Sequence, residues 1–302
     1  MPHRRPDEAI PRTRKTGVRT TPDYDPIVSR HYDKAAAEHG IAPSSTMPDE
    51  ITRSKESETI LRFVETVARG RKARGTAGKK LLIADVGCGN GYTLSRLATA
   101  LPGHRFVGIE FNDNLRSLAE RQLAGIRSAK ILSGDLRDVD SIALAKGSVD
   151  VLVCQRVLIN LLDIEHQRAG LETIVGLVKP GGALLFIEAF ASGQRLLNDA
   201  RAEFGLTEIK PVPHNMYLPD DFFEHKALRA LDLAKAGIRE NLLSTHYFVT
   251  RVLHDVALMA AGRDGFIRNS HFVRFFSAAL PDAIGNYSPL RIRTFEKVRR
   301  VR

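Results

Sequence analysis

The feature that most limits the fold of this chain is a regular alternation of apolar and amphipathic segments that begins near residue 80. Helices are predicted between the apolar runs, at about 92–101, 113–126, 138–146 and 163–178. Apolar strands that alternate with helices are typical of a parallel sheet that is covered by helices on both faces. The nearly continuous apolar runs lie at 80–87, 105–111, 129–135, 149–155 and 182–190.

The segment before this alternation has a different character. Residues 1–23 are rich in Arg, Pro and Thr and show no hydrophobic period, so they are predicted to be disordered. A short helix is predicted within 25–40, with Gly40 as its stop. Apolar residues at helical spacing predict an amphipathic helix over 52–70. We therefore expect residues 24–79 to form a helical cap.

After the fifth strand the pattern becomes less regular. Residues 190–236 contain turn signals and clustered aromatic side chains, followed by a helical pattern over 224–237. The run at 238–244 is interpreted as a sixth strand, and 246–281 as helical. Apolar residues that alternate with Arg, Thr and Glu predict a last strand within 285–298.

The net charge of +10 raises the question of a nucleic-acid partner. Residues 1–20 carry a net +4 and residues 291–302 a net +5, so the body of the chain is nearly neutral. A nucleic-acid enzyme usually carries its basic surface on the domain that acts, so this charge distribution argues against a nucleic-acid partner. Two cysteines, no apolar run long enough for a membrane and no signal-peptide pattern predict a cytoplasmic protein with no membrane partner.

The stretch "ADVGCGNG" at 84–91 reads as a strand that enters a glycine turn. Its glycines follow the pattern G-x-G-x-G, whereas a dinucleotide site uses G-x-G-x-x-G. Asp85, Glu110 and Asp135 stand at the ends of three consecutive predicted strands. An acid beside the turn would repel the pyrophosphate of NAD but attract the cationic end of a sulfonium donor. The acids therefore favour a methyl donor over a dinucleotide.

These segments, together with "VGIEFN", "LSGDLRD", "VDVLVCQRVLINL" and "LVKPGGALLFIEAF", resemble the class I S-adenosylmethionine-dependent methyltransferases. The resemblance spans about residues 80–190. It implies an α/β fold with a doubly wound, mostly parallel sheet of seven strands whose last strand is antiparallel. Residues 80–302 would form the methyltransferase domain, with substrate-side insertions at about 190–236 and 246–285. It also implies transferase activity with S-adenosylmethionine as the cofactor.

The resemblance further implies which residues hold the donor. The glycines would allow close backbone approach, Glu110 would hold the ribose, and Asp135 with Leu136 the adenine edge. Tyr32 would cover the donor, and Arg53 would reach its carboxylate. The complete expected set is Tyr32, Arg53, Asp85, Gly87, Cys88, Gly89, Gly91, Glu110, Phe111, Asp135, Leu136, Gln155 and Arg156.

The acceptor is less well defined. Segments such as "PHNMYL" and "STHYFVTRV" are similar to bacterial methyltransferases of surface-polysaccharide and natural-product pathways. That similarity implies a polar small molecule or sugar as the acceptor, methylated on oxygen. A hydroxyl acceptor benefits from a base, for which Glu188, His246 and His214 are the candidates. No metal site is expected, because Gln155 and Arg156 stand where a metal-dependent enzyme would place acids.

Two other functions stay open at this point. An RNA or DNA methyltransferase would use the basic ends, although the chain lacks an Asn-Pro-Pro-Tyr motif. A donor-binding scaffold without catalysis would have less need of the intact acids. The sequence leaves a homodimer open as well.

Overall fold

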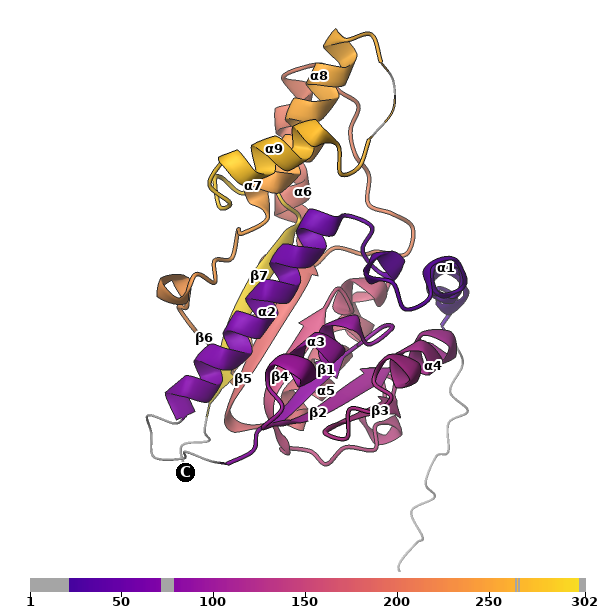
Figure 1. Ribbon diagram of the computed structural model, residues 1–302, viewed down its shortest axis with the longest axis vertical. Helices are drawn as coiled ribbons and strands as arrows, with labels where there is room; N and C mark the ends of the chain where they lie inside the picture. Colours follow the sequence, from indigo (N-terminus) through magenta and orange to yellow (C-terminus); the bar gives the residue numbers. More distant parts are fainter. Residues whose placement is uncertain (1–21, 72–78, 264, 266, 299–302) are drawn as a thin grey trace, which may run out of the picture.

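The structure is a computed structural model that describes residues 22–71, 79–263, 265 and 267–298. Its centre is a sheet of seven strands in the order β3-β2-β1-β4-β5-β7-β6 (Figure 1). Strands β1 to β5 run parallel, and β7 is antiparallel to both of its neighbours. This confirms the predicted sheet. The strands are β1 (Leu82–Val86), β2 (Arg105–Glu110), β3 (Ala129–Ser133), β4 (Val149–Gln155), β5 (Val178–Ala189), β6 (Leu228–Ala230) and β7 (Leu290–Lys297).

The two faces of the sheet are covered by different helices. Successive strand side chains point to opposite faces, so Val151 and Val153 of β4 join one apolar cluster while Leu152 joins the other. The first cluster lies under α2 and α3, and the second under α5 and the segment after β5. The helices that flank the sheet on its two faces are α2 (Glu50–Arg71), α3 (Tyr92–Ala100), α4 (Asp113–Gln122) and α5 (Ile164–Leu177).

The two predicted N-terminal helices are present. Helix α1 (Asp25–His39) ends at Gly40, whose φ of 54° suits a residue without a Cβ. Helix α2 begins after Asp49, whose carboxylate accepts the backbone N–H of Thr52 at 2.9 Å. The predicted disordered tail 1–23 lies outside the described residues except for its last two positions.

Three sequence predictions were wrong. The expected helix at 138–146 is only a short 3-10 turn at Val139–Ser141, where the Asp138 side chain bonds the backbone N–H of Asp140. The helical pattern at 224–237 instead contains strand β6, which pairs with the edge of β7. Tertiary pairing overrides helix propensity there. The expected strand at 238–244 is a loop, from which Ile238 enters the core under α2.

The predicted helical region after residue 244 forms a small layer beyond the carboxyl end of β5 (Figure 1). It includes a π-helix, Val249–Leu253, that the sequence pattern did not predict. The α-helices of this layer are α7 (Ser244–Phe248), α8 (His254–Ala260) and α9 (His271–Ala279), and α6 (Ala191–Ala202) packs with them. The predicted last strand is present as β7, and Arg291 and Arg293 lie within it.

Candidate active site

The glycine turn after β1 is a tight connection between that strand and α3. Gly87 and Cys88 donate their backbone N–H groups to the carbonyl of Ile109 on β2, at 2.8 and 3.2 Å. Gly87 has a φ of 63°, and a Cβ there would lie 2.3 Å from Cγ2 of Val157. Only glycine fits this position, so the backbone is left bare on the side that faces the end of the sheet.

Three carboxylates stand at neighbouring strand ends, as predicted. Asp85 is the next-to-last residue of β1 and is buried; its burial raises its pKa to about 7, an effect that Arg53 opposes. Glu110 ends β2, and its two oxygens accept the backbone N–H groups of Gly89 and Asn112 at 2.8 and 2.9 Å. Burial raises the pKa of Glu110, and these backbone hydrogen bonds oppose the rise. Asp135 follows β3.

These residues line one cavity at the carboxyl ends of β1 to β4, with about 1080 Å³ of space when its open mouth is included. Gly91, also predicted to contact the donor, does not line it; this residue lies against Ala119 and precedes α3. The predicted donor residues in the cavity wall are Tyr32, Arg53, Asp85, Gly87, Cys88, Gly89, Glu110, Phe111, Asp135, Leu136, Gln155 and Arg156.

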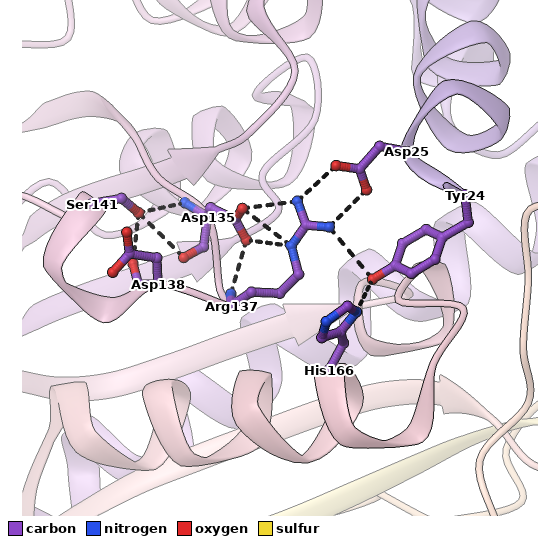
Figure 2. A network of polar contacts seen from close by, with 7 residues as sticks. All are labelled: Tyr24, Asp25, Asp135, Arg137, Asp138, Ser141 and His166. Atoms are coloured by element: carbon purple, nitrogen blue, oxygen red, sulfur yellow. Dashed lines mark hydrogen bonds and ion pairs between the residues drawn. The ribbon is translucent and has the colours of Figure 1, made fainter. Parts of the chain in front are cut away.

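A polar network that the sequence reasoning missed closes one side of the cavity (Figure 2). Arg137 binds Asp135 through its Nε and Nη2 atoms and Asp25 of α1 through both terminal nitrogens. The hydroxyl of Tyr24 lies 2.7 Å from Nδ1 of His166. The motif "LSGDLRD" contains Arg137, but no local signal connects it with a residue more than a hundred positions away.

A second missed residue, Glu56 of α2, holds the end of β4. Its carboxylate is fully buried and accepts from Arg156 Nη1 at 2.5 Å and from Gln155 Nε2 at 2.7 Å. Arg156 has a φ of 55°, which is uncommon for a residue with a side chain. Strained backbone of this kind is often found at functional sites.

None of the three predicted catalytic residues lines the cavity. Glu188 is fully buried, and its carboxylate accepts the backbone N–H groups of residues 157, 158 and 159. Burial raises the pKa of Glu188 to about 7. His246 is buried between Asp49 and Ser277, with both ring nitrogens engaged. Their part in catalysis stays a prediction.

His214, the third candidate, lies close to the mouth of the cavity. Its ring stacks on that of His31 in α1, with centroids 3.6 Å apart. Its carbonyl accepts a hydrogen bond from Nδ2 of Asn160, which lines the cavity. Burial lowers the pKa of His214 to about 4, and His31 adds to the effect.

The two cysteines differ in their access to the cavity. Both are free thiols and both are buried. Cys88 lines the cavity, whereas Cys154 is fully buried and its Sγ donates to Glu188 at 3.5 Å. Cys154 is directed into the sheet face that α5 covers, which is why only one thiol reaches the cavity.

Comparisons with known proteins agree with this geometry. A family model described as a methyltransferase domain matches residues 84–184. The rRNA N(6)-adenosine-methyltransferase metl-5 of Caenorhabditis elegans is 26% identical over 167 residues, which cover 53% of this chain and 74% of that protein. The crystal structure of the N-methyltransferase NodS from Bradyrhizobium japonicum WM9 with S-adenosyl-L-homocysteine matches with a TM-score of 0.50 and 14% identity, over 89% of this chain and 98% of that one.

Residues 84–184 of the chain therefore form a methyltransferase domain, and its sheet has the strand order expected for the class I S-adenosylmethionine-dependent methyltransferases. The cofactor of such a domain is S-adenosylmethionine, and its other substrate is a methyl acceptor. Among the described residues, no helix is long and apolar enough to cross a membrane. Within the same residues, no group of three or more His, Cys, Asp or Glu side chains is arranged to hold a metal ion.

Proposed function

We propose that this enzyme methylates a hydroxyl oxygen of a polar small molecule or sugar. The observation that carries the proposal is the cover over the cavity. The Tyr32 hydroxyl of α1 donates to Oδ1 of Asn160 at 2.7 Å, and Nδ2 of Asn160 bonds Asn215 of the segment after β5 at 2.8 Å. The ring stack between His31 and His214 adds a second link between these segments. A covered cavity suits a small acceptor, because a polymer needs an open groove.

The donor would occupy the part of the cavity nearest the glycine turn. Glu110 would accept from the ribose hydroxyls, and Asp135 from the adenine amino group. Asp85 would attract the amino group of the methionine moiety, and Arg53 would pair with its carboxylate. Arg53 is buried, with Nη2 bonded to Oγ1 of Thr46 at 2.7 Å, which favours a fixed position for such a contact.

Methyl transfer is an in-line displacement. The acceptor oxygen forms a bond to the methyl carbon while the carbon–sulfur bond breaks, and the hydroxyl proton passes to a base. Of the three candidate bases, His214 is the best placed, since neither of its ring nitrogens has a hydrogen-bond partner among the described residues. Glu188 would instead hold the loop after β4 in position, because its oxygens already accept three backbone N–H groups.

A nucleic-acid acceptor is the second candidate, and the similarity to an rRNA adenosine methyltransferase favours it. Two observations weigh against it. Strand β4 ends at Gln155, and the sequence at 155–158 is "QRVL", where amino-group nucleic-acid methylases carry an Asn-Pro-Pro-Tyr type motif. The charge of the chain between its basic ends is close to zero.

Incubation with labelled S-adenosylmethionine and cell extract tests the proposal. After separation into RNA, protein and small-molecule fractions, the methyl label is expected in the small-molecule fraction. At low donor concentration the Glu110→Ala variant should strongly reduce that label, while Glu120→Ala, an exposed position on α4, should leave it unchanged. Label that is found in RNA and removed by ribonuclease would contradict a small acceptor.

A further inference from the structure

Beyond the end of β4, aromatic and basic side chains from four segments come together. Arg156 lines the donor cavity, and Tyr247 of α7 lies near enough that its hydroxyl influences the guanidinium. Burial alone would lower the pKa of Arg156, but the pKa is raised, mainly by Glu56 and then by Tyr32 and Tyr247. Arg251 of the π-helix lies over the Tyr247 ring, with Cζ 3.9 Å from the ring centroid. The cluster therefore begins at the cavity wall and continues under α7.

Arg251 differs from three other buried or half-buried arginines near the site. Arg137 is paired with Asp25, Arg156 with Glu56, and Arg201 with Asp255. Arg251 makes no ion pair among the described residues; its guanidinium donates to Oγ1 of Thr250 at 2.7 Å. Arg251 is therefore a cation that no carboxylate of the described chain binds, as is Arg53 at the donor end of the cavity, which bonds only the Pro43 carbonyl and the Thr46 hydroxyl.

Asp49 interacts with Arg251 but does not serve as its partner. Arg251 lowers the pKa of Asp49, so the two charges interact, although burial acts in the opposite direction and His246 has the larger lowering effect. Both oxygens of Asp49 are occupied by His246 Nε2, at 3.0 and 2.9 Å, and one of them also accepts the backbone N–H of Thr52. Asp49 is therefore the hydrogen-bond partner of His246 rather than of Arg251.

Two tyrosine hydroxyls beside Arg251 are also unused. Burial raises the pKa of Tyr247 to about 12 and also raises that of Tyr217, while Arg251 lowers both, so both hydroxyls are protonated donors near neutral pH. Within the described part of the chain neither hydroxyl has a hydrogen-bond partner, and neither is among the polar atoms enclosed without one. Tyr247 is only 7% exposed. The small exposed part of Tyr247 therefore includes its hydroxyl, while the ring is buried.

The backbone supports this arrangement. Tyr247 and Arg251 are four positions apart across the start of the π-helix Val249–Leu253. π-Helical turns are rare and are often found at functional sites, because they change the direction of side chains at some cost in hydrogen-bond geometry. Here the turn coincides with the placement of Arg251 over the Tyr247 ring. The turn and the unpaired cation are independent observations that indicate a ligand at this place.

We propose that Arg251, with the Tyr247 and Tyr217 hydroxyls, binds an anionic oxygen group of the acceptor, so that the substrate is a small hydroxy acid or a sugar that carries a carboxylate or phosphate. The inference rests on the proposed function and names its substrate class. A partly buried cation without a partner is costly, and a carboxylate or phosphate supplies charge-assisted hydrogen bonds. Arg156, held by Glu56, would face the transferred methyl group from the cavity wall.

Matched probes test this in the complex with S-adenosyl-L-homocysteine. Calorimetry should show that 4-hydroxybenzoate binds the complex about tenfold or more tightly than its neutral analogue 4-hydroxybenzamide, the difference expected from a charge-assisted contact. Inorganic phosphate should compete with 4-hydroxybenzoate if phosphate groups fit the site, and should fail to compete if it is specific for carboxylates. Both results of the phosphate competition are compatible with an anion site, and they show whether it accepts phosphate groups or only carboxylates.

Four variants separate binding from folding. Arg251→Gln should remove the preference for the benzoate, Arg251→Lys should keep part of it, and Tyr247→Phe should reduce it while the ring under the guanidinium is retained. Arg263→Gln, at an exposed position after α8, is the matched control and should bind like the wild type. All four should bind S-adenosyl-L-homocysteine with unchanged affinity.

The failure of the two proposals can be distinguished. The anion site is overturned if the wild type binds S-adenosyl-L-homocysteine but does not prefer 4-hydroxybenzoate to 4-hydroxybenzamide. Failure to bind either probe counts as the same result. A benzoate preference that persists in Arg251→Gln overturns the assignment to Arg251. A methyl label that appears only in RNA overturns the small-molecule function itself, whatever the probes do.

Discussion

Arg137 and Asp25 lie 112 positions apart in the chain and are joined by two hydrogen bonds, from Nη1 to Oδ1 at 2.7 Å and from Nη2 to Oδ2 at 3.0 Å (Figure 2). The same guanidinium also binds Asp135 at the end of β3. Burial alone would lower the pKa of Arg137, but Asp135 and Asp25 raise it. Helix α1 is therefore fixed by a charged pair to the side of the cavity where the adenine is expected.

The first prediction concerns this link. Asp25→Asn should make S-adenosyl-L-homocysteine dissociate roughly fivefold faster or more, because loss of a charge-assisted pair worth about 1–3 kcal/mol loosens the wall that α1 provides. Stopped-flow displacement measures the rate. Asp23→Asn, at an exposed position two residues earlier, is the matched control and should not change it. An unchanged dissociation rate in Asp25→Asn would show that α1 does not restrain the donor.

The second prediction concerns the donor acids. Glu110→Ala and Asp135→Ala should each weaken S-adenosylmethionine binding by about 1–3 kcal/mol, through the loss of charge-assisted hydrogen bonds in a partly buried site. Calorimetry measures the affinity, with Glu120→Ala as the control for a lost surface carboxylate. For Asp135→Ala part of the loss should come from Arg137, which would retain Asp25 as its one ionic partner within the described residues. Unchanged affinity in both variants would refute the assignment.

The third prediction follows from Glu188. Burial raises its pKa to about 7 from 4.5, so the folded protein binds a proton more tightly than the unfolded chain. The stabilisation that this proton supplies is complete below pH 4.5 and is lost as the pH rises through about 7. Between pH 4.5 and pH 7.5 the wild type should therefore lose about 1–3 kcal/mol of unfolding free energy relative to the Glu188→Gln variant.

Denaturant titrations of both proteins across this range measure the difference. The comparison with the variant matters because His31, His104 and His214 have lowered pKa values and give stability the opposite dependence on pH. Those contributions are the same in both proteins and cancel. A difference that stays constant with pH would mean that Glu188 is ionised throughout.

The strand ends were predictable from the sequence, and the contacts between distant segments were not. An acid that follows an apolar run marks the end of a strand, so Asp85, Glu110 and Asp135 could be placed together from the sequence alone. Glu56 and Asp25 carry no such local mark, because their partners are on other elements. The π-helix was missed for a related reason: its apolar spacing differs from that of an α-helix by a single residue.

The cysteines provide the last test, because only one of them reaches the cavity. Burial raises the pKa of both thiols well above the ordinary value, so alkylation of either should be slow in the folded protein. Cys88 lines the cavity, and S-adenosylmethionine or S-adenosyl-L-homocysteine should slow its alkylation further, whereas NADH should not. Cys154 is fully buried beside Glu188 and should react only when the protein unfolds. Peptide mass spectrometry after timed treatment with iodoacetamide distinguishes the two sites. Protection of Cys88 by NADH but not by S-adenosyl-L-homocysteine would contradict the placement of the methyl donor beside the glycine turn.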